Sequence, residues 1–324
     1  MSANTIRTAL GLLQDDPDHE QAYLDLKEAL GSGTPEGMSA DDARALLASA
    51  RRAHEARREY DAVASLLELE VLLAQGSDGE IDLLRELARV ADEELFDDGR
   101  AENVYGRILE VVPGDDTAEE AIERVRAKRA KWSELAVRYA DEAGSAGEPR
   151  LKSSLLVSAA ETAYRYGRAA LAGEKGSKKK LAALQTEIVT RLEEALEVDP
   201  KNRRAGALLE RIYREGAKWE PLASLLEKVA TEASAKDEKT AGFLRLARVL
   251  AKKIQSPERA VAAYEGVLDL SPGNDEATSF LVDFFTAREM WDHLVSLYEG
   301  QLATSARHGK EDIGIVLQLA MVDW

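Results

Sequence analysis

Residues 246–275 read LARVLAKKIQSPERAVAAYEGVLDLSPGND, and residues 87–116 read LARVADEELFDDGRAENVYGRILEVVPGDD. The two segments align without a gap, begin with the same four residues and close on the same Pro-Gly turn. An ungapped match between distant parts of one chain indicates internal duplication, which is typical of solenoids built from stacked repeats.

Aromatic residues give the period of the duplication. Trp291 follows Trp219 by 72 residues, and Trp132 follows Tyr60 by the same interval. Trp132 and Trp219 are 87 residues apart, which leaves 15 additional residues between them. We expect an insertion near residues 170–184, where Gly and Lys are frequent.

Proline marks turns in the same register. Pro113, Pro200 and Pro272 each precede a Trp by 19 residues, and each is followed two residues later by Asp or Asn. Proline disfavours helix at the residue before it, and Asn or Asp close behind favours a turn. Between the turns, apolar residues recur at helical spacing, as in 260–270, and no useful length alternates with period two. We therefore predict an all-α, right-handed solenoid of stacked antiparallel helical hairpins with no sheet.

The 36-residue half-period and the residues around each Pro resemble the tetratricopeptide repeat (TPR). That family places a small residue twelve positions before its closing Pro and an aromatic residue eight positions before it. Ala260 and Tyr264 match those positions before Pro272, and Ala101 and Tyr105 match them in the earlier copy. The resemblance covers nearly the whole chain and implies a scaffold that holds a partner peptide or helix in a concave groove. By analogy with the inward-facing first helices of the family, we expect the following residues to face the groove: Arg126, Tyr213, Arg214 and Phe285.

The chain divides into a cap and a solenoid in this interpretation. Residues 1–40 are expected to form N-terminal cap helices and a loop, and residues 41–324 one continuous TPR-like solenoid whose last unit is truncated. Solenoid ends expose apolar surface unless they are capped. End-to-end self-association, a partner at the C-terminal end, and continuation into a longer protein therefore remain open.

Charge is unevenly distributed along the chain. The formal net charge is −17, but residues 1–100 carry −13, residues 151–250 carry +5 and residues 251–324 carry −6. Lys178, Lys179 and Lys180 lie in the basic part and form either a solvated loop or a contact element for an acidic segment. An acidic chain is a poor general binder of nucleic acid, so protein partners are expected. An RNA-associated scaffold, similar to the half-a-TPR repeats of RNA-processing complexes, is the alternative.

Composition argues against catalysis. The chain has no Cys, which excludes disulfides and zinc–thiolate sites, and none of its four His residues has ligand-spaced partners. No nucleophile–base arrangement or nucleotide-binding loop stands out. We therefore expect a non-enzymatic scaffold with no metal or cofactor. No apolar run reaches about 18 residues and the N-terminus does not read as a signal peptide, so a cytoplasmic location and no membrane insertion are expected.

Overall fold

The structure is a computed structural model that describes residues 3–31, 37–77, 79–172 and 177–307. The described residues are helices joined by turns and short loops, and no strand occurs among them. The prediction of an all-α fold is confirmed.

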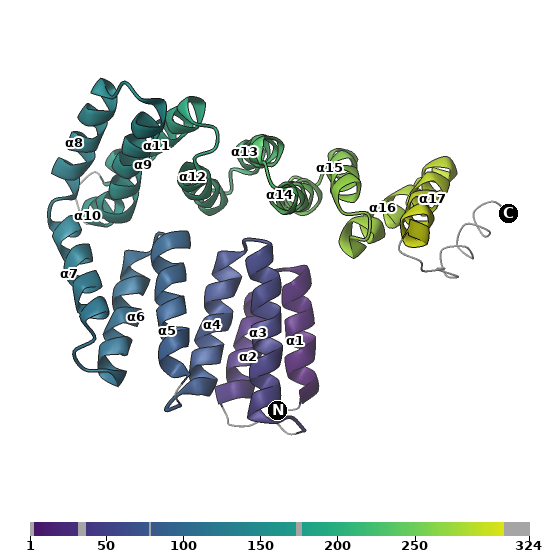
Figure 1. The fold of residues 1–324 in the computed structure, drawn as a ribbon, viewed down its shortest axis with the longest axis horizontal. Helices are drawn as coiled ribbons and strands as arrows, with labels where there is room; N and C mark the ends of the chain where they lie inside the picture. Colours follow the sequence, from purple (N-terminus) through teal and green to yellow (C-terminus); the bar gives the residue numbers. More distant parts are fainter. Residues whose placement is uncertain (1–2, 32–36, 78, 173–176, 308–324) are drawn as a thin grey trace. The chain divides into compact units, whose positions relative to one another are not determined.

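The chain forms two compact units, Met1–Arg211 and Ile212–Trp324, each shown as successive helices in Figure 1. The helices of the first unit are α1 (Ala3–Asp15), α2 (Glu20–Gly31), α3 (Ala40–Ala56), α4 (Tyr60–Ala74), α5 (Glu80–Arg89), α6 (Asp98–Val111), α7 (Asp116–Ala130), α8 (Trp132–Ser145), α9 (Pro149–Thr162), α10 (Arg168–Ala172) and α11 (Ser177–Val198). Helix α12 (Arg203–Glu215) contains the division, and the second unit continues with α13 (Trp219–Glu232), α14 (Lys236–Arg248), α15 (Pro257–Leu270), α16 (Asp275–Ala287) and α17 (Trp291–Arg307).

Consecutive helices pack as hairpins within each unit. Helix α3 packs on α4 and α5 on α6 in the first unit, and α14 packs on α15 and α16 on α17 in the second. Leu26, Leu47 and Leu66, from α2, α3 and α4, have no exposed surface and belong to one core cluster with residues of α1. Because burial of each such side chain stabilises by about 1.5–3 kcal/mol, stacking is what holds these short helices. The cap predicted for residues 1–40 stays a prediction.

The predicted repeat markers fall at helix boundaries. Tyr60, Trp132, Trp219 and Trp291 are the first residues of α4, α8, α13 and α17. Each of the four aromatic residues that give the period therefore opens a helix.

Each marker proline lies between the end of one hairpin and a capped helix start. The side chains of Asp115, Asn202 and Asn274, two residues after the prolines, accept hydrogen bonds from the backbone N–H three residues on, at 2.9, 3.0 and 2.9 Å. This is N-capping, in which a short polar side chain satisfies an otherwise unpaired N–H of the first turn. Asp and Asn therefore begin α7, α12 and α16.

A short π-helical segment follows one helix in each of the three intervals between the aromatic markers, which are 72, 87 and 72 residues long. These segments are η1 (Val90–Glu94), η2 (Ala163–Gly167) and η3 (Val249–Lys253). In η1 and η3 the backbone closes with the same bond, five residues back, from Leu95 N–H to the Val90 carbonyl and from Ile254 N–H to the Val249 carbonyl. The periodicity of the apolar residues did not indicate these segments.

Residues other than glycine adopt left-handed backbone conformations at repeated positions. Arg58, Ala217 and Glu289 have φ of 57°, 49° and 56°, each two residues before the aromatic residue that opens the next helix. Phe96 and Gln255 follow η1 and η3 with φ of 53° and 59°. This conformation costs non-glycine residues about 1–2 kcal/mol, so each turn is held by the packing on either side of it.

Candidate functional site

The seven residues expected to bind a partner lie in different environments. Arg126 is exposed on α7, and Lys178, Lys179 and Lys180 are exposed in the first turn of α11. Arg214, in the last turn of α12, is half-buried.

The two aromatic residues of that set are buried. Tyr213 retains 8% of its surface and Phe285 3%, and the Phe285 ring packs against His293 with their centroids 5.1 Å apart. A partner could reach these rings only through a rearrangement of the hairpin. Partner binding at all seven positions stays a prediction.

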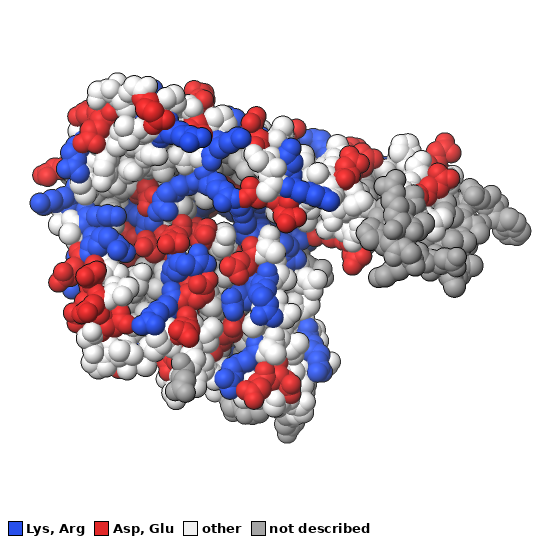
Figure 2. Space-filling view, in the orientation of Figure 1, with Lys and Arg blue, Asp and Glu red and all other residues white. Residues whose placement is uncertain are grey.

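Three arginines of α7, which are Arg124, Arg126 and Arg129, pair with carboxylates of the first unit. Arg126 and Arg129 both bind Glu102 of α6 at 2.9 Å, and Arg124 lies 3.6 Å from Asp92. The hydrogen bond from Arg126, with that from Arg129, lowers the pKa of Glu102. Figure 2 shows Lys and Arg interspersed with Asp and Glu over the helices of the first unit. The carboxylates of Asp92 and Glu102 therefore offset part of the positive charge of these three arginines.

A buried ion-pair network joins η1, α6, α9 and η2 of the first unit. The guanidinium of Arg165 binds Asp92 at 2.9 Å, Glu161 at 2.8 Å and Asp98, and only 5% of the Arg165 side chain is exposed. Arg204, at the start of α12, binds the same Glu161 at 2.7 Å. Burial by itself would raise the pKa of Glu161, but the Arg204 hydrogen bond and the charge of Arg165 outweigh it and lower that pKa.

Phe96 lies between two members of this network. Its ring centroid is 5.4 Å from the guanidinium carbon of Arg165 and 5.1 Å from that of Arg204, which are cation–π distances. The network therefore holds an aromatic ring and two arginines in fixed geometry across three hairpins. Its ion pairs join η1, α6, α9, η2 and the start of α12, so the network cross-links helices that are distant in sequence.

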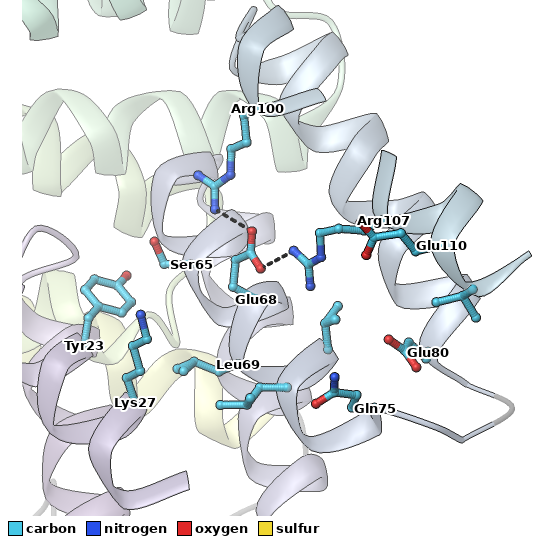
Figure 3. A pocket seen from close by; sticks show the side chains of 13 residues that line it. Tyr23, Lys27, Ser65, Glu68, Leu69, Gln75, Glu80, Arg100, Arg107 and Glu110 are labelled. Carbon is cyan, nitrogen blue, oxygen red and sulfur yellow. Dashed lines mark hydrogen bonds and ion pairs between the residues drawn. The ribbon is translucent and has the colours of Figure 1, made fainter. Parts of the chain in front are cut away.

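A groove in the first unit has the form of a binding site. It encloses a volume of about 570 Å³, within the 300–1,000 Å³ range of ligand pockets. Figure 3 shows the side chains that line it, which come from α2, the start of α5, α4 and α6. The lining residues are Tyr23, Lys27, Ser65, Glu68, Leu69, Val71, Leu72, Gln75, Glu80, Arg100, Arg107, Glu110 and Val111.

The groove contains exposed apolar surface. Leu72 on α4 and Val111 at the end of α6 are 39% and 44% exposed, beside the buried Leu69 and Val71. Isolated exposed apolar residues are ordinary, but two that line one concave surface with a buried apolar floor are a candidate contact area.

Charged side chains in the middle of the groove pair with one another. Arg107 donates to Glu68 at 2.7 Å, and Arg100 lies 3.8 Å from the other oxygen of the same carboxylate (Figure 3). Arg100 also donates to the Ala64 carbonyl at 3.2 Å. Glu80 accepts a hydrogen bond from the Gly76 backbone N–H at 2.7 Å. These groups are positioned by the fold before any partner arrives.

Sequence reasoning missed this groove, although α4 carried a signal for it. Its sequence, YDAVASLLELEVLLA, is apolar on almost every face, whereas a surface helix normally keeps a polar face. Such a helix needs neighbouring helices or a partner on several of its faces. The exposed side chain of Leu72 shows that the described part of the chain leaves one face of α4 accessible to solvent.

Metal binding and membrane crossing are the two remaining features to consider for the described residues. Among the described residues, no group of three or more His, Cys, Asp or Glu is placed to hold a metal ion. No helix in the described part of the chain is long and apolar enough to cross a bilayer. The expectation that the protein uses no metal or cofactor stays a prediction.

Comparisons with known proteins return only distant similarity. No protein-family model matches, and no curated protein matches. One similar solved structure is the TPR domain of P58(IPK), at 16% identity and a TM-score of 0.22, with 94% of this chain and 97% of that chain covered. Another is Naa15/Naa10 bound to HypK-THB, at 13% identity and a TM-score of 0.24, with 98% of this chain and 62% of that chain covered.

The chain has a TPR-like helical-repeat fold. The described helices pack in sequence order as stacked hairpins, and the expected all-α helical-repeat fold is confirmed by them. Identities below 25% and TM-scores below 0.5 say nothing about function.

Proposed function

We propose that this protein is a non-enzymatic scaffold that binds a segment of a partner protein in the groove between α2, α4 and α6. The observation that carries the proposal is the exposure of Leu72 and Val111 over a buried apolar floor. Covering such surface removes apolar area from water, which drives most protein association.

The surroundings of the floor support the proposal. Glu68, Arg100 and Arg107 are fixed by mutual ion pairs, so they can form hydrogen bonds with little loss of side-chain freedom on binding. All lining residues except Gln75 lie on helices, which hold a site more precisely than loops do. A cytoplasmic location is part of this proposal.

RNA binding is the alternative function, and the ion pairs of the α7 arginines argue against it. Arg124, Arg126 and Arg129 face carboxylates of their own unit, so neutralising a phosphate would require breaking those pairs. Self-association through the C-terminal end concerns residues 308–324, which lie outside the described residues.

Site-specific photo-crosslinking tests the proposal. A photoreactive amino acid is placed at Leu72 or at Val111 in the full chain, and the protein is illuminated in lysate of its native cells. The matched control is Val137 on α8, which is 58% exposed and does not line the groove. We expect one protein, crosslinked through one segment, at both groove positions and not at Val137, and loss of that product when Leu72→Arg is combined with the probe at Val111. Equal capture at all three positions, or none at the groove, would overturn the proposal.

A further inference from the structure

Two charged side chains that line the groove have no partner within it, whereas the other charged side chains of the lining are paired or hydrogen-bonded. Lys27 is exposed on α2, and Glu110 is exposed on α6. Within the described residues neither makes an ion pair or a side-chain hydrogen bond. Figure 3 shows Lys27 on one side of the groove and Glu110 on the other, with Leu69 of α4 between them. The apolar floor is thus bordered by one basic and one acidic side chain.

The paired charges cannot replace these two in selecting a partner. Glu68 lies between the guanidinium groups of Arg100 and Arg107, so this cluster keeps one net positive charge, but all three side chains are already engaged in ion pairs. The Glu80 carboxylate is only slightly exposed and bound to the backbone at Gly76. Because an approaching side chain gains most from a charge with no partner, the edges of the groove carry the electrostatic preference.

The backbone of the groove favours a helical occupant. Apart from the turn at Gln75, its walls are helices, and a helix bonds its backbone N–H and C=O groups along its own axis and offers no edge to pair with an extended strand. An extended segment would have to leave its own backbone groups to water or to a few side chains. A helix satisfies its backbone internally and needs only side-chain complementarity.

We propose that the groove takes an amphipathic helix of a partner protein. The apolar face of that helix is bordered by acidic side chains along the edge toward Lys27 and by basic side chains along the edge toward Glu110. The inference rests on the proposed function and adds to it the conformation and charge pattern of the partner segment.

The charge pattern also fixes the direction of the bound helix. Turning the helix end for end, with its apolar face still on Leu72 and Val111, exchanges its two edges. The acidic edge would then face Glu110 and the basic edge Lys27, and like charges placed together oppose binding. The groove therefore accepts one direction of the helix and rejects the other.

A displayed library of 15-residue peptides tests the inference on the full chain. Every peptide carries apolar residues at positions i, i+4, i+7 and i+11, and the two flanking edges are randomised. We expect selected peptides to carry Asp or Glu along one edge and Lys or Arg along the other, and to become helical on binding by circular dichroism. Selection against the charge-exchanged variant Lys27→Glu/Glu110→Lys is expected to yield peptides with the edges reversed.

Affinities measured by fluorescence anisotropy give the second readout. A peptide selected on the natural chain is expected to bind the charge-exchanged variant about tenfold more weakly, because two weak exposed pairs are both inverted. The matched control is Glu123→Lys/Lys128→Glu, which exchanges two exposed charges of α7 outside the groove and should leave affinity unchanged.

The possible outcomes separate this inference from the proposed function. Peptides that lose binding with Leu72→Arg but show no edge preference, or bind without becoming helical, overturn the inference and leave the groove as a binding site. Peptides whose binding does not change with Leu72→Arg bind at another site of the chain. Such peptides count against the proposed function as well.

Discussion

Replacing Gly242 by Ala probes the tightest contact between two helices of the second unit. Gly242 lies in α14, and a Cβ added there would lie 2.7 Å from the Ala230 Cβ of α13 and 3.0 Å from its Cα. Carbon atoms in contact prefer about 3.5–4.0 Å, and neither obstructing atom can move without its backbone. The two helices must therefore separate to admit one methyl group.

The expected magnitude follows from two opposing effects. Overpacking a well-packed interior costs about 1–3 kcal/mol, whereas Ala in place of Gly within a helix stabilises by about 0.5–1 kcal/mol. The matched control is Gly266→Ala in α15, where the added Cβ meets Phe243 at an ordinary 3.7 Å. The control carries the helix-propensity gain without the clash, so Gly242→Ala is expected to be less stable than Gly266→Ala by about 1–3 kcal/mol.

Urea unfolding, followed by circular dichroism and by the fluorescence of Trp219 and Trp291, measures these differences. A reciprocal exchange adds a second check: Gly242→Ala combined with Ala230→Gly moves the methyl group to the other helix and removes the closer contact, at 2.7 Å, while the contact with the Cα at 3.0 Å stays. The double variant should be more stable than the sum of the two single changes by about 1–3 kcal/mol. Equal unfolding free energies for Gly242→Ala and Gly266→Ala, or strictly additive single changes, would refute the reasoning.

Three further predictions concern turns, the buried network and pH. Ala217→Gly and Glu289→Gly should each raise the urea midpoint, by about 1 kcal/mol in unfolding free energy, because Gly adopts positive φ without strain; a lower midpoint would contradict this. Arg165→Met should cost about 3–5 kcal/mol by leaving the buried carboxylate of Asp98 without its arginine, whereas Arg138→Met, at an exposed pair, should change stability by less than about 1 kcal/mol; equal effects would show that the network adds nothing. The pKa of Glu161 is lower in the folded than in the unfolded chain, so its contribution is present above about pH 4.5 and is lost as pH falls through the folded value. Stability of Glu161→Gln should therefore fall less steeply from pH 5 to pH 3, and an unchanged slope would contradict the assignment.

Features that depend on local sequence could be predicted. Trp132 and Trp219 mark helix starts because the pattern of apolar residues after them is helical, and Asn202 and Asn274 follow turns where a short polar side chain caps the next helix. Each of these features involves residues only a few positions apart. A sequence motif that recurs along the chain therefore gives a helix start that recurs in the structure.

Features that depend on distant partners could not be predicted. The positive charges of Arg126 and Arg129 were visible, but the carboxylate of Glu102 that balances them lies on another helix. Tyr213 and Phe285 were assigned to a groove by analogy, whereas the structure buries both rings. The groove itself combines residues of α2, α4 and α6 whose proximity is set by stacking, and no single stretch of sequence contains it.

Arg165 links helices of the first unit that are not neighbours in the sequence, and a simple stack of repeats has no such link. In a simple solenoid each repeat contacts only its neighbours, so the array can bend at any joint and fray from an end. Arg165, in η2 after α9, instead binds Asp92 in η1 and Asp98 in α6. Helices α7 and α8 lie between these partners and Arg165 in the sequence. Separating η2 from η1 and α6 would break several charge-assisted hydrogen bonds of Arg165 at the same time. We expect the hairpins between α5 and η2 to unfold together as one cooperative block rather than one repeat at a time.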